Sequence, residues 1–279
     1  MMRGMFAAIS GLKNHQVMLD VTANDIANVN TIGYKSARTT FKDSLTQLQR
    51  GSSGASGANG GSNAAQVGLG VGLGSIDNLM TGGALQSTGN PLDVAIQGEG
   101  FFKVAQAVPP ALPAAGTEQF TRAGNFTTNT AGFLTTQEGF YVMGRSAAGA
   151  GGTDQLLQIP AGGTNVAIGQ DGSVSYIPTG GGARTTVGFL AIATFQNAAG
   201  LERASGNRWL TSANSGGAAV DTPGNAGKGL TSAGTIEMSN VDLAQTFTSM
   251  ITAQRGFQAN SRVISTADEM LQDLVNLKR

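Results

Sequence analysis

Few side chains in this sequence could carry out chemistry. His15 is its only histidine, and cysteine is absent. A serine nucleophile activated by histidine needs that base beside it, but His15 lies in an N-terminal segment with helical periodicity, whereas the middle of the chain has β-strand patterning. The same two counts exclude His/Cys metal sites. We therefore interpret His15 as a residue on the surface of a helix.

Paired carboxylates could hydrolyse a glycosidic bond or hold a metal ion. Acidic residues of the β-patterned middle include Asp77, Asp93, Glu99, Asp154 and Asp171. Each stands in a turn or at a strand end, where Asp and Glu are ordinary. The glycines of GLGVGLG (68–74) lack dinucleotide-loop spacing, and GNAGKG (224–229) lacks the first glycine and the Ser/Thr of a phosphate loop. We expect no enzyme activity, no metal and no cofactor.

Composition narrows the class of partner. The 279 residues include 17 Lys and Arg against 17 Asp and Glu, so the basic excess typical of nucleic-acid binding is missing. No run approaches the roughly 20 apolar residues of a membrane helix, and the N-terminus has no convincing cleavable signal. We expect no nucleic-acid partner and no membrane insertion. The location would be cytoplasmic, unless export leaves the N-terminus in place.

Both ends of the chain have the spacing of amphipathic helices. The segment from Met2 to about Asn28 has an apolar seam that includes Met5, Ile9, Leu12, Leu19 and Ile26. The segment from Ser239 onward has a second seam at Leu243, Phe247, Met250, Phe257, Ile264, Leu271 and Val275. Asp242 with Gln245 resembles a helix capping box, and Gly256 is a weak point within the helix. Such seams favour either assembly with further copies or pairing of the two helices in a monomer.

The chain between these segments has the pattern of strands and turns. We predict an α+β fold, with terminal α-helices flanking an all-β middle domain. The predicted divisions are an N-terminal helix (1–33), a Gly-rich extended linker (34–75), an all-β domain (76–237) and a C-terminal helix (238–279). Within the linker, residues 50–66 should form a flexible loop. The apolar run 186–195 is predicted as one buried central strand, and Trp209 as a core residue.

Four segments resemble the bacterial flagellar rod and hook protein family. ANDIANVNTIGYK (23–35) is similar to the N-terminal signature of that family, here with Asn24, Asn28, Asn30 and Gly33. The stretches 87–104, with LDVAI and GFF, and 120–126, FTRAGNF, resemble two internal blocks. Residues 237–279 resemble the C-terminal signature. The resemblance thus covers both ends and parts of the middle, in order.

The resemblance implies a non-enzymatic subunit that polymerises with copies of itself. The terminal helices would form the coiled-coil inner core of a tube, with the β domain as its outer layer. The short length and the C-terminal sequence are most similar to compact hook proteins of Gram-positive type, and a distal rod subunit is the alternative. A hook is a curved joint that transmits torque, and the Gly-rich residues 50–66 and 68–74 would then supply compliance between the layers.

The resemblance also implies partners and a location. The partners would be the distal rod, hook cap and hook–filament junction proteins, together with the flagellar type III export apparatus. The protein would be extracellular, in the flagellar hook, and exported without a cleaved signal. Phe41 and Leu45 match a short export-gate motif, although a local packing contact near the β domain explains them equally well. An unrelated β-rich carbohydrate-binding or hydrolytic module remains as the last alternative.

Overall fold

The computed structural model describes residues 2–54, 60–107, 109, 111–113, 116–149, 152–179 and 182–277. Residues 55–59 of the expected flexible loop lie outside this description. The chain divides into two compact units. The helical unit comprises Met1–Ala27, Ala37–Asn78 and Asp242–Arg279, and the β unit comprises Asn28–Ser36 and Leu79–Val241. The α+β class predicted from the sequence is confirmed.

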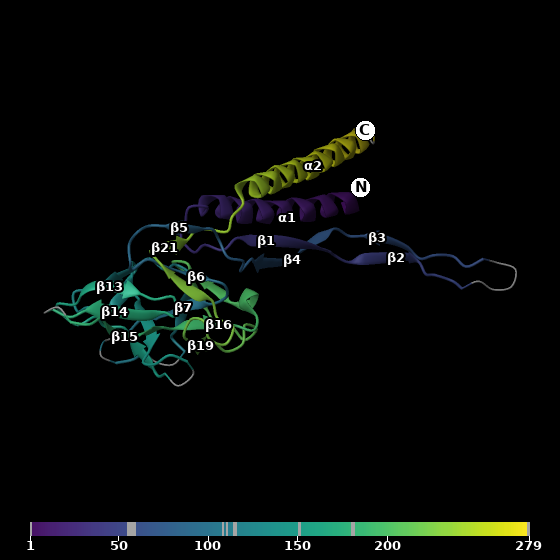
Figure 1. Cartoon of the computed structure of the whole chain (residues 1–279). Coiled ribbons are helices and arrows are strands. Elements are labelled where there is room, and N and C mark those ends of the chain that lie inside the picture. Colours follow the sequence, from purple (N-terminus) through teal and green to yellow (C-terminus); the bar gives the residue numbers. More distant parts are fainter. Residues whose placement is uncertain are drawn as a thin grey trace. The chain divides into compact units, whose positions relative to one another are not determined.

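The helical unit consists of two antiparallel helices and two short ladders (Figure 1). Helix α1 (Met2–Ala27) packs along α2 (Leu243–Asn276). Helix α2 begins where the sequence predicts, because the Asp242 carboxylate accepts hydrogen bonds from the backbone N–H groups of Ala244 and Gln245 at 2.9 and 3.1 Å.

The segment 34–75 differs from the extended linker expected there. Strand β1 (Ala37–Asp43) pairs antiparallel with β4 (Val71–Asn78), and β2 (Thr46–Arg50) pairs with β3 (Ala65–Gly68). A glycine-rich composition does not prevent pairing, because a ladder uses backbone groups that every residue but proline possesses. This β1–β4 ladder is held to α1 by Asn14, whose side-chain amide donates to the Val71 carbonyl at 2.7 Å.

The β unit contains the remaining described strands, which are short. They are β5 (Leu85–Ser87), β6 (Val94–Gln97), β7 (Phe101–Ala105), β8 (Gln119–Thr121), β9 (Phe126–Thr128), β10 (Leu134–Thr136), β11 (Tyr141–Arg145), β12 (Asp154–Leu156), β13 (Thr164–Ile168), β14 (Ser173–Ile177), β15 (Thr185–Leu190), β16 (Ile192–Thr194), β17 (Glu202–Ala204), β18 (Arg208–Leu210), β19 (Ala219–Asp221), β20 (Leu230–Ala233) and β21 (Thr235–Glu237). A single 3-10 turn, η1 (Ala198–Gly200), precedes β17.

All strand pairs of the β unit are antiparallel. The main sheet has the order β13-β14-β15-β11-β7-β8-β18-β17, with β9, β10, β12, β16 and β19 attached beside this path. Two small ladders, β20-β6 and β21-β5, join the last two strands of the unit to its first two strands. The predicted single strand 186–195 is wrong: it is interrupted at Ala191, because β15 pairs with β14 and β11 whereas β16 pairs with β7 and β19.

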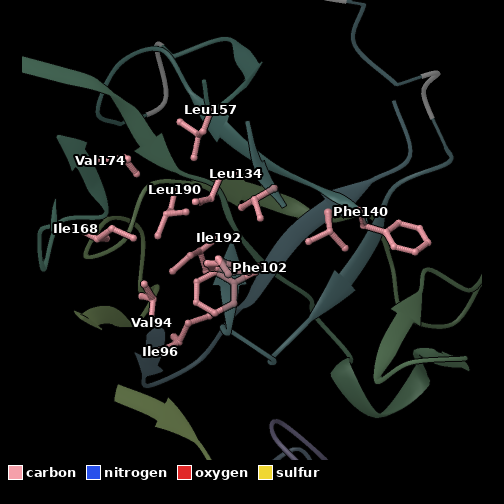
Figure 2. Packing of buried hydrophobic residues seen from close by; sticks show 13 residues of the cluster. Val94, Ile96, Phe102, Leu134, Phe140, Leu157, Ile168, Val174, Leu190 and Ile192 are labelled. Carbon is pink, nitrogen blue, oxygen red and sulfur yellow. The ribbon is translucent and has the colours of Figure 1, made fainter. Parts of the chain in front are cut away.

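The core of the β unit is made of aliphatic and phenylalanine side chains from these strands. Figure 2 shows the side chains of β6, β7, β15 and β16, among others, converging on one cluster. Its members are Val94, Ile96, Phe102, Val104, Phe126, Leu134, Phe140, Val142, Leu157, Ile168, Val174, Leu190 and Ile192. A second cluster surrounds Trp209, which is 2% exposed and confirms its predicted place in the core.

Candidate functional site

The two long helices contact each other at two glycines. A Cβ atom at Gly11 of α1 would lie 2.8 Å from Nδ2 of Asn260, and one at Gly256 of α2 would lie 2.5 Å from Nε2 of His15. Each glycine therefore receives a polar side chain of the opposite helix. Because the separation of packed helices depends on the side chains at their contact, larger residues at either position would force the helices apart.

His15 differs from the surface residue expected from the sequence. It is half-buried between three elements, with its ring over Gly256 of α2 and edge-on to the Phe41 ring of β1, at 5.7 Å between centroids. Gly256, expected from helix propensity to be a weak point within the helix, is also a contact position. Phe41 thus has a packing partner, whereas the other residue of the suggested export motif, Leu45, is 72% exposed.

The N-terminal seam lies beside the tightest part of the helix contact. Met5, Ile9, Leu12, Leu19 and Ile26 are all half-buried. The fully buried positions of α1 are small or polar instead: Ala8, Gly11, Asn14, Thr22 and Asp25. Among these, Gly11 lies against Asn260 of α2, whereas Asn14 donates to the Val71 carbonyl of β4.

The C-terminal seam is divided between two environments. Met250, Phe257, Ile264 and Leu271 are half-buried, and Leu243, Phe247 and Val275 are 42%, 49% and 67% exposed. Further large apolar residues of the two helices are exposed too: Met2, Phe6, Ile251, Val263, Met270, Leu274 and Leu277. Single exposed apolar side chains are ordinary, but a series of them along paired helices is typical of an interaction surface.

The family signature residues are divided between the two units. Asn24 lies in the last turn of α1, and Asn28, Asn30 and Gly33 belong to the β unit. Asn28 and Asn30 line a polar cavity of about 490 Å³ that also contains the ion pair between Glu138 and Arg208.

Gly33 occupies a position that only glycine fits well. Its φ is +67°, and a Cβ there would lie 2.6 Å from the backbone nitrogen of Ala123. Glycine adopts positive φ without penalty and permits this close approach of two backbones.

A buried cluster of three charged residues lies in the β unit. The Glu237 carboxylate binds Lys35 at 2.5 Å and Arg122 at 3.0 Å, and their side chains are 1%, 0% and 4% exposed. Burial would raise the pKa of Glu237, but the two cations and the hydrogen bonds of Lys35 and Gly83 lower it below its ordinary value. Burial lowers the pKa of Lys35, against the opposing effect of Glu237. Two cations thus share one carboxylate in a site nearly closed to water.

None of these three residues was predicted as a site residue from the sequence. One sequence feature could have located them: Lys35, Arg122 and Glu237 lie inside the family-like segments of a chain with only 12% charged residues. Over the described ranges, no group of three or more His, Asp or Glu side chains could share a metal ion. In the same part of the chain, no helix is both long and apolar enough to cross a membrane.

Comparison with known proteins identifies the family of this chain. Three family profiles match: flagella basal body rod protein at residues 5–35, flagellar hook protein FlgE/F/G D1 domain at 95–176, and flagellar basal body rod FlgEFG protein C-terminal at 232–277. The flagellar basal-body rod protein FlgG of Bacillus subtilis (strain 168) is 45% identical over 280 residues, covering 100% of both chains. The chain belongs to the flagellar rod and hook protein family. Members of this family are structural components of the flagellum.

Other relatives include both rod proteins and a hook protein. The basal-body rod protein FlgG of Caulobacter vibrioides is 37% identical over 279 residues, covering 99% of this chain and 100% of that protein. The flagellar hook protein FlgE of Borreliella burgdorferi is 27% identical over 441 residues, with both chains fully covered. The residues of the buried charge cluster all lie inside the profile-matched ranges of this rod and hook family member.

Proposed function

We propose that this chain is a structural subunit of the distal rod of the flagellar basal body. The observation that carries the proposal is its end-to-end similarity to rod proteins: 45% identity to the Bacillus FlgG over 280 residues, with full coverage of both chains. The alignment with the Borreliella hook protein extends over 441 residues, so that hook protein has stretches without a counterpart here. Length and identity therefore favour the rod over the hook reading suggested by the C-terminal sequence.

The paired strands of the helical unit also support a rod. The hook reading required compliance in residues 50–66 and 68–74, but β2 and β3 pair from Thr46↔Gly68 to Arg50↔Ala65, and a further bridge joins Ser53 to Ser62. A hydrogen-bonded ladder restricts the backbone far more than a Gly/Ser linker does. This pairing suits an element that stays straight under torque.

The subunit would polymerise through its helical unit. The exposed apolar residues of α1 and α2, including Phe247 and Val275, are the surface offered to further copies. The half-buried seam residues Met5, Ile9, Leu12, Leu19 and Ile26 of α1, with Met250, Phe257, Ile264 and Leu271 of α2, would support that surface. In the assembled tube the helices would contribute the inner-core contacts. Neighbouring rod and hook subunits would be its axial partners.

Export through the flagellar type III apparatus, without a cleaved signal, is part of the same proposal. Phe41 and Leu45 are both exposed, at 39% and 72%, and so are available to an export gate. Phe41 also contacts His15, so a substitution there would combine an export effect with a packing effect. Leu45 is the cleaner position for a test of export.

The deciding experiment is electron microscopy of basal bodies from a strain that lacks this gene. A distal rod subunit predicts rods that end early and carry no hook. Full-length rods without hooks would assign the chain to the hook instead. Intact flagella would contradict both. Restoring the gene on a plasmid controls for effects on neighbouring genes.

A further inference from the structure

The chain passes between its two units four times, after Ala27, Ser36, Asn78 and Val241. Residues beside three of these passages meet in one hydrogen-bonded cluster inside the β unit. The Ser36 N–H donates to Oδ1 of Asn240 at 2.8 Å, and the Leu79 N–H donates to the Ser36 carbonyl at 2.8 Å. The amide of Asn240 donates to the Leu79 carbonyl at 2.9 Å and closes the ring.

Asn240 is the centre of this cluster. Besides Leu79, its amide nitrogen lies within hydrogen-bond distance of the Thr81 carbonyl and hydroxyl, at 3.2 and 3.0 Å. Its backbone N–H points to the Tyr34 carbonyl at 3.4 Å. One side chain therefore links backbone groups from segments far apart in sequence, which a residue without both a donor and an acceptor could not do.

The buried charges hold the same segments together. Lys35 donates to the Thr81 carbonyl at 2.8 Å, and the Gly83 N–H donates to the Glu237 carboxylate at 2.9 Å. The Gly33 N–H donates to the Glu237 carbonyl at 2.8 Å. The segment after α1, the segment after β4 and the segment before α2 are thus joined by both backbone and ionic contacts.

We infer that Asn240, together with the Lys35–Glu237–Arg122 cluster, forms a clamp that holds three chain passages at fixed spacing in the free subunit, whether or not the helices are folded. The clamp is called the connector clamp below. Every contact named for it lies within the β unit, which has its own apolar core. The stability of the connector clamp therefore does not require the helix pair. Asn240 acts as a positioning residue for the segments that lead into β1, β4 and α2.

The consequence for polymerisation rests on the proposed function. If helices are ordered as a subunit joins, the entropy lost at that step falls when their starting points are already held. An incoming subunit then has to order its helices but not the segments that lead to them. The connector clamp would thereby raise the rate and extent of polymerisation without contacting another subunit.

Amide hydrogen exchange on the full-length monomer tests the connector clamp directly. The wild-type amides of Ser36 and Leu79 should exchange as slowly as those of β6 and β7, and more slowly than amides of α1 and α2. Asn240→Ala should accelerate exchange at Ser36 and Leu79 about tenfold, the effect of losing a well-formed hydrogen bond, and leave β6 and β7 unchanged. Asn197→Ala is the matched control, since its amide donates to the Asn214 carbonyl elsewhere in the β unit.

Two results would overturn the inference. Exchange at Ser36 and Leu79 as fast as in the helices of the wild-type protein would show that no clamp exists in the free subunit, and this needs no variant that folds. Unchanged exchange at Ser36 and Leu79 in Asn240→Ala would show that Asn240 is not the centre of the connector clamp. Neither measurement depends on whether the polymer is a rod or a hook, so failure of the clamp and failure of the proposed function remain distinguishable.

Discussion

The imidazole of His15 occupies the space above Gly256, where a Cβ would lie 2.5 Å from Nε2. One contact thus explains both the only histidine of the chain and the glycine in the middle of its longest helix. The contact between Gly11 and Asn260 lies one turn away on each helix. The two contacts are reciprocal, because each helix supplies one glycine and one polar side chain. The spacing of the helices is therefore set by two glycines, and the apolar positions beside them remain partly uncovered.

Gly256→Ala should destabilise the helical unit. Alanine gains about 1 kcal/mol of helix propensity over glycine. Overpacking against the His15 ring costs about 1–3 kcal/mol, which exceeds that gain. Thermal unfolding followed by helical circular dichroism should show a lower midpoint. Gly4→Ala is the control: among the described residues, no atom beyond its chain neighbours and its own helix backbone lies within 4 Å of its Cβ, so only the propensity gain applies and the midpoint should rise. Equal shifts in both variants would contradict the helix contact.

Substitutions in the buried charge cluster should have unequal effects. Glu237→Gln leaves Lys35 and Arg122 as two buried cations without a counter-charge, at a cost of about 3–5 kcal/mol. Lys35→Met leaves the Arg122–Glu237 pair balanced and should cost far less. Trp209, the only tryptophan and buried in the β unit, reports this unfolding by fluorescence in urea. Similar losses of unfolding free energy in the two variants would show that uncompensated positive charge does not explain the cost of Glu237→Gln.

Acid should weaken the β unit through Glu237. The folded-state pKa of this carboxylate is lowered, so its stabilising contribution is complete above the ordinary value of 4.5 and is lost as pH falls through the folded-state pKa. Urea unfolding followed by Trp209, from neutral pH to about pH 3, should show this loss. In Lys35→Met the pKa of Glu237 moves toward its ordinary value, so the acid dependence should be shallower. The same pH dependence in both proteins would assign it to other carboxylates.

Gly33→Ala should destabilise the β unit more than Gly89→Ala. Both glycines have positive φ, +67° and +72°, which costs an alanine about 1–2 kcal/mol. Only Gly33 also meets backbone, at 2.6 Å from the Ala123 nitrogen, whereas nothing lies within 4 Å at Gly89. The difference between the two midpoints in urea isolates the close approach. A difference of zero would show that conformation alone requires glycine at this signature position.

Phe247→Ser should impair polymerisation but not folding. Phe247 is 49% exposed on α2, so its loss removes apolar surface offered to further copies with a small effect within the subunit. Sedimentation of polymers formed by purified protein should show a smaller pelleted fraction, with an unchanged unfolding midpoint by helical circular dichroism. Leu112→Ser is the matched control, because Leu112 is 52% exposed on the β unit. Normal polymerisation of the Phe247 variant would exclude this part of α2 from the assembly surface.

The sequence was sufficient for the helices and the class of fold. The 3-4 spacing of apolar residues predicted α1 and α2, and Asp242 marked the start of α2 because a cap depends on neighbours in the chain. The Asp171–Gly172 turn between β13 and β14 was likewise predictable, since Gly172 supplies the positive φ of a tight turn.

The sequence was insufficient where distant segments meet. From the sequence, Gly256 was expected only to weaken α2. Its contact with His15 could not be predicted, because the two residues are remote in the chain. Residues 46–68 were expected to be mostly linker, because a two-stranded ladder needs no apolar pattern of its own. The three charged residues of the buried cluster come from separate segments, and nothing local indicates that they converge near Asn240. Such contacts depend on tertiary structure, which periodicity does not describe.

The pairing of the first helix with the last has a consequence for the order of folding during synthesis. Helix α1 leaves the ribosome more than 200 residues before α2. The contact between Gly11 and Asn260 closes one of the longest loops in the chain, and such closures form late. Until then the apolar positions of α1 lack their intramolecular cover. A nascent subunit therefore exposes helix α1 to any binding factor until α2 has been synthesised.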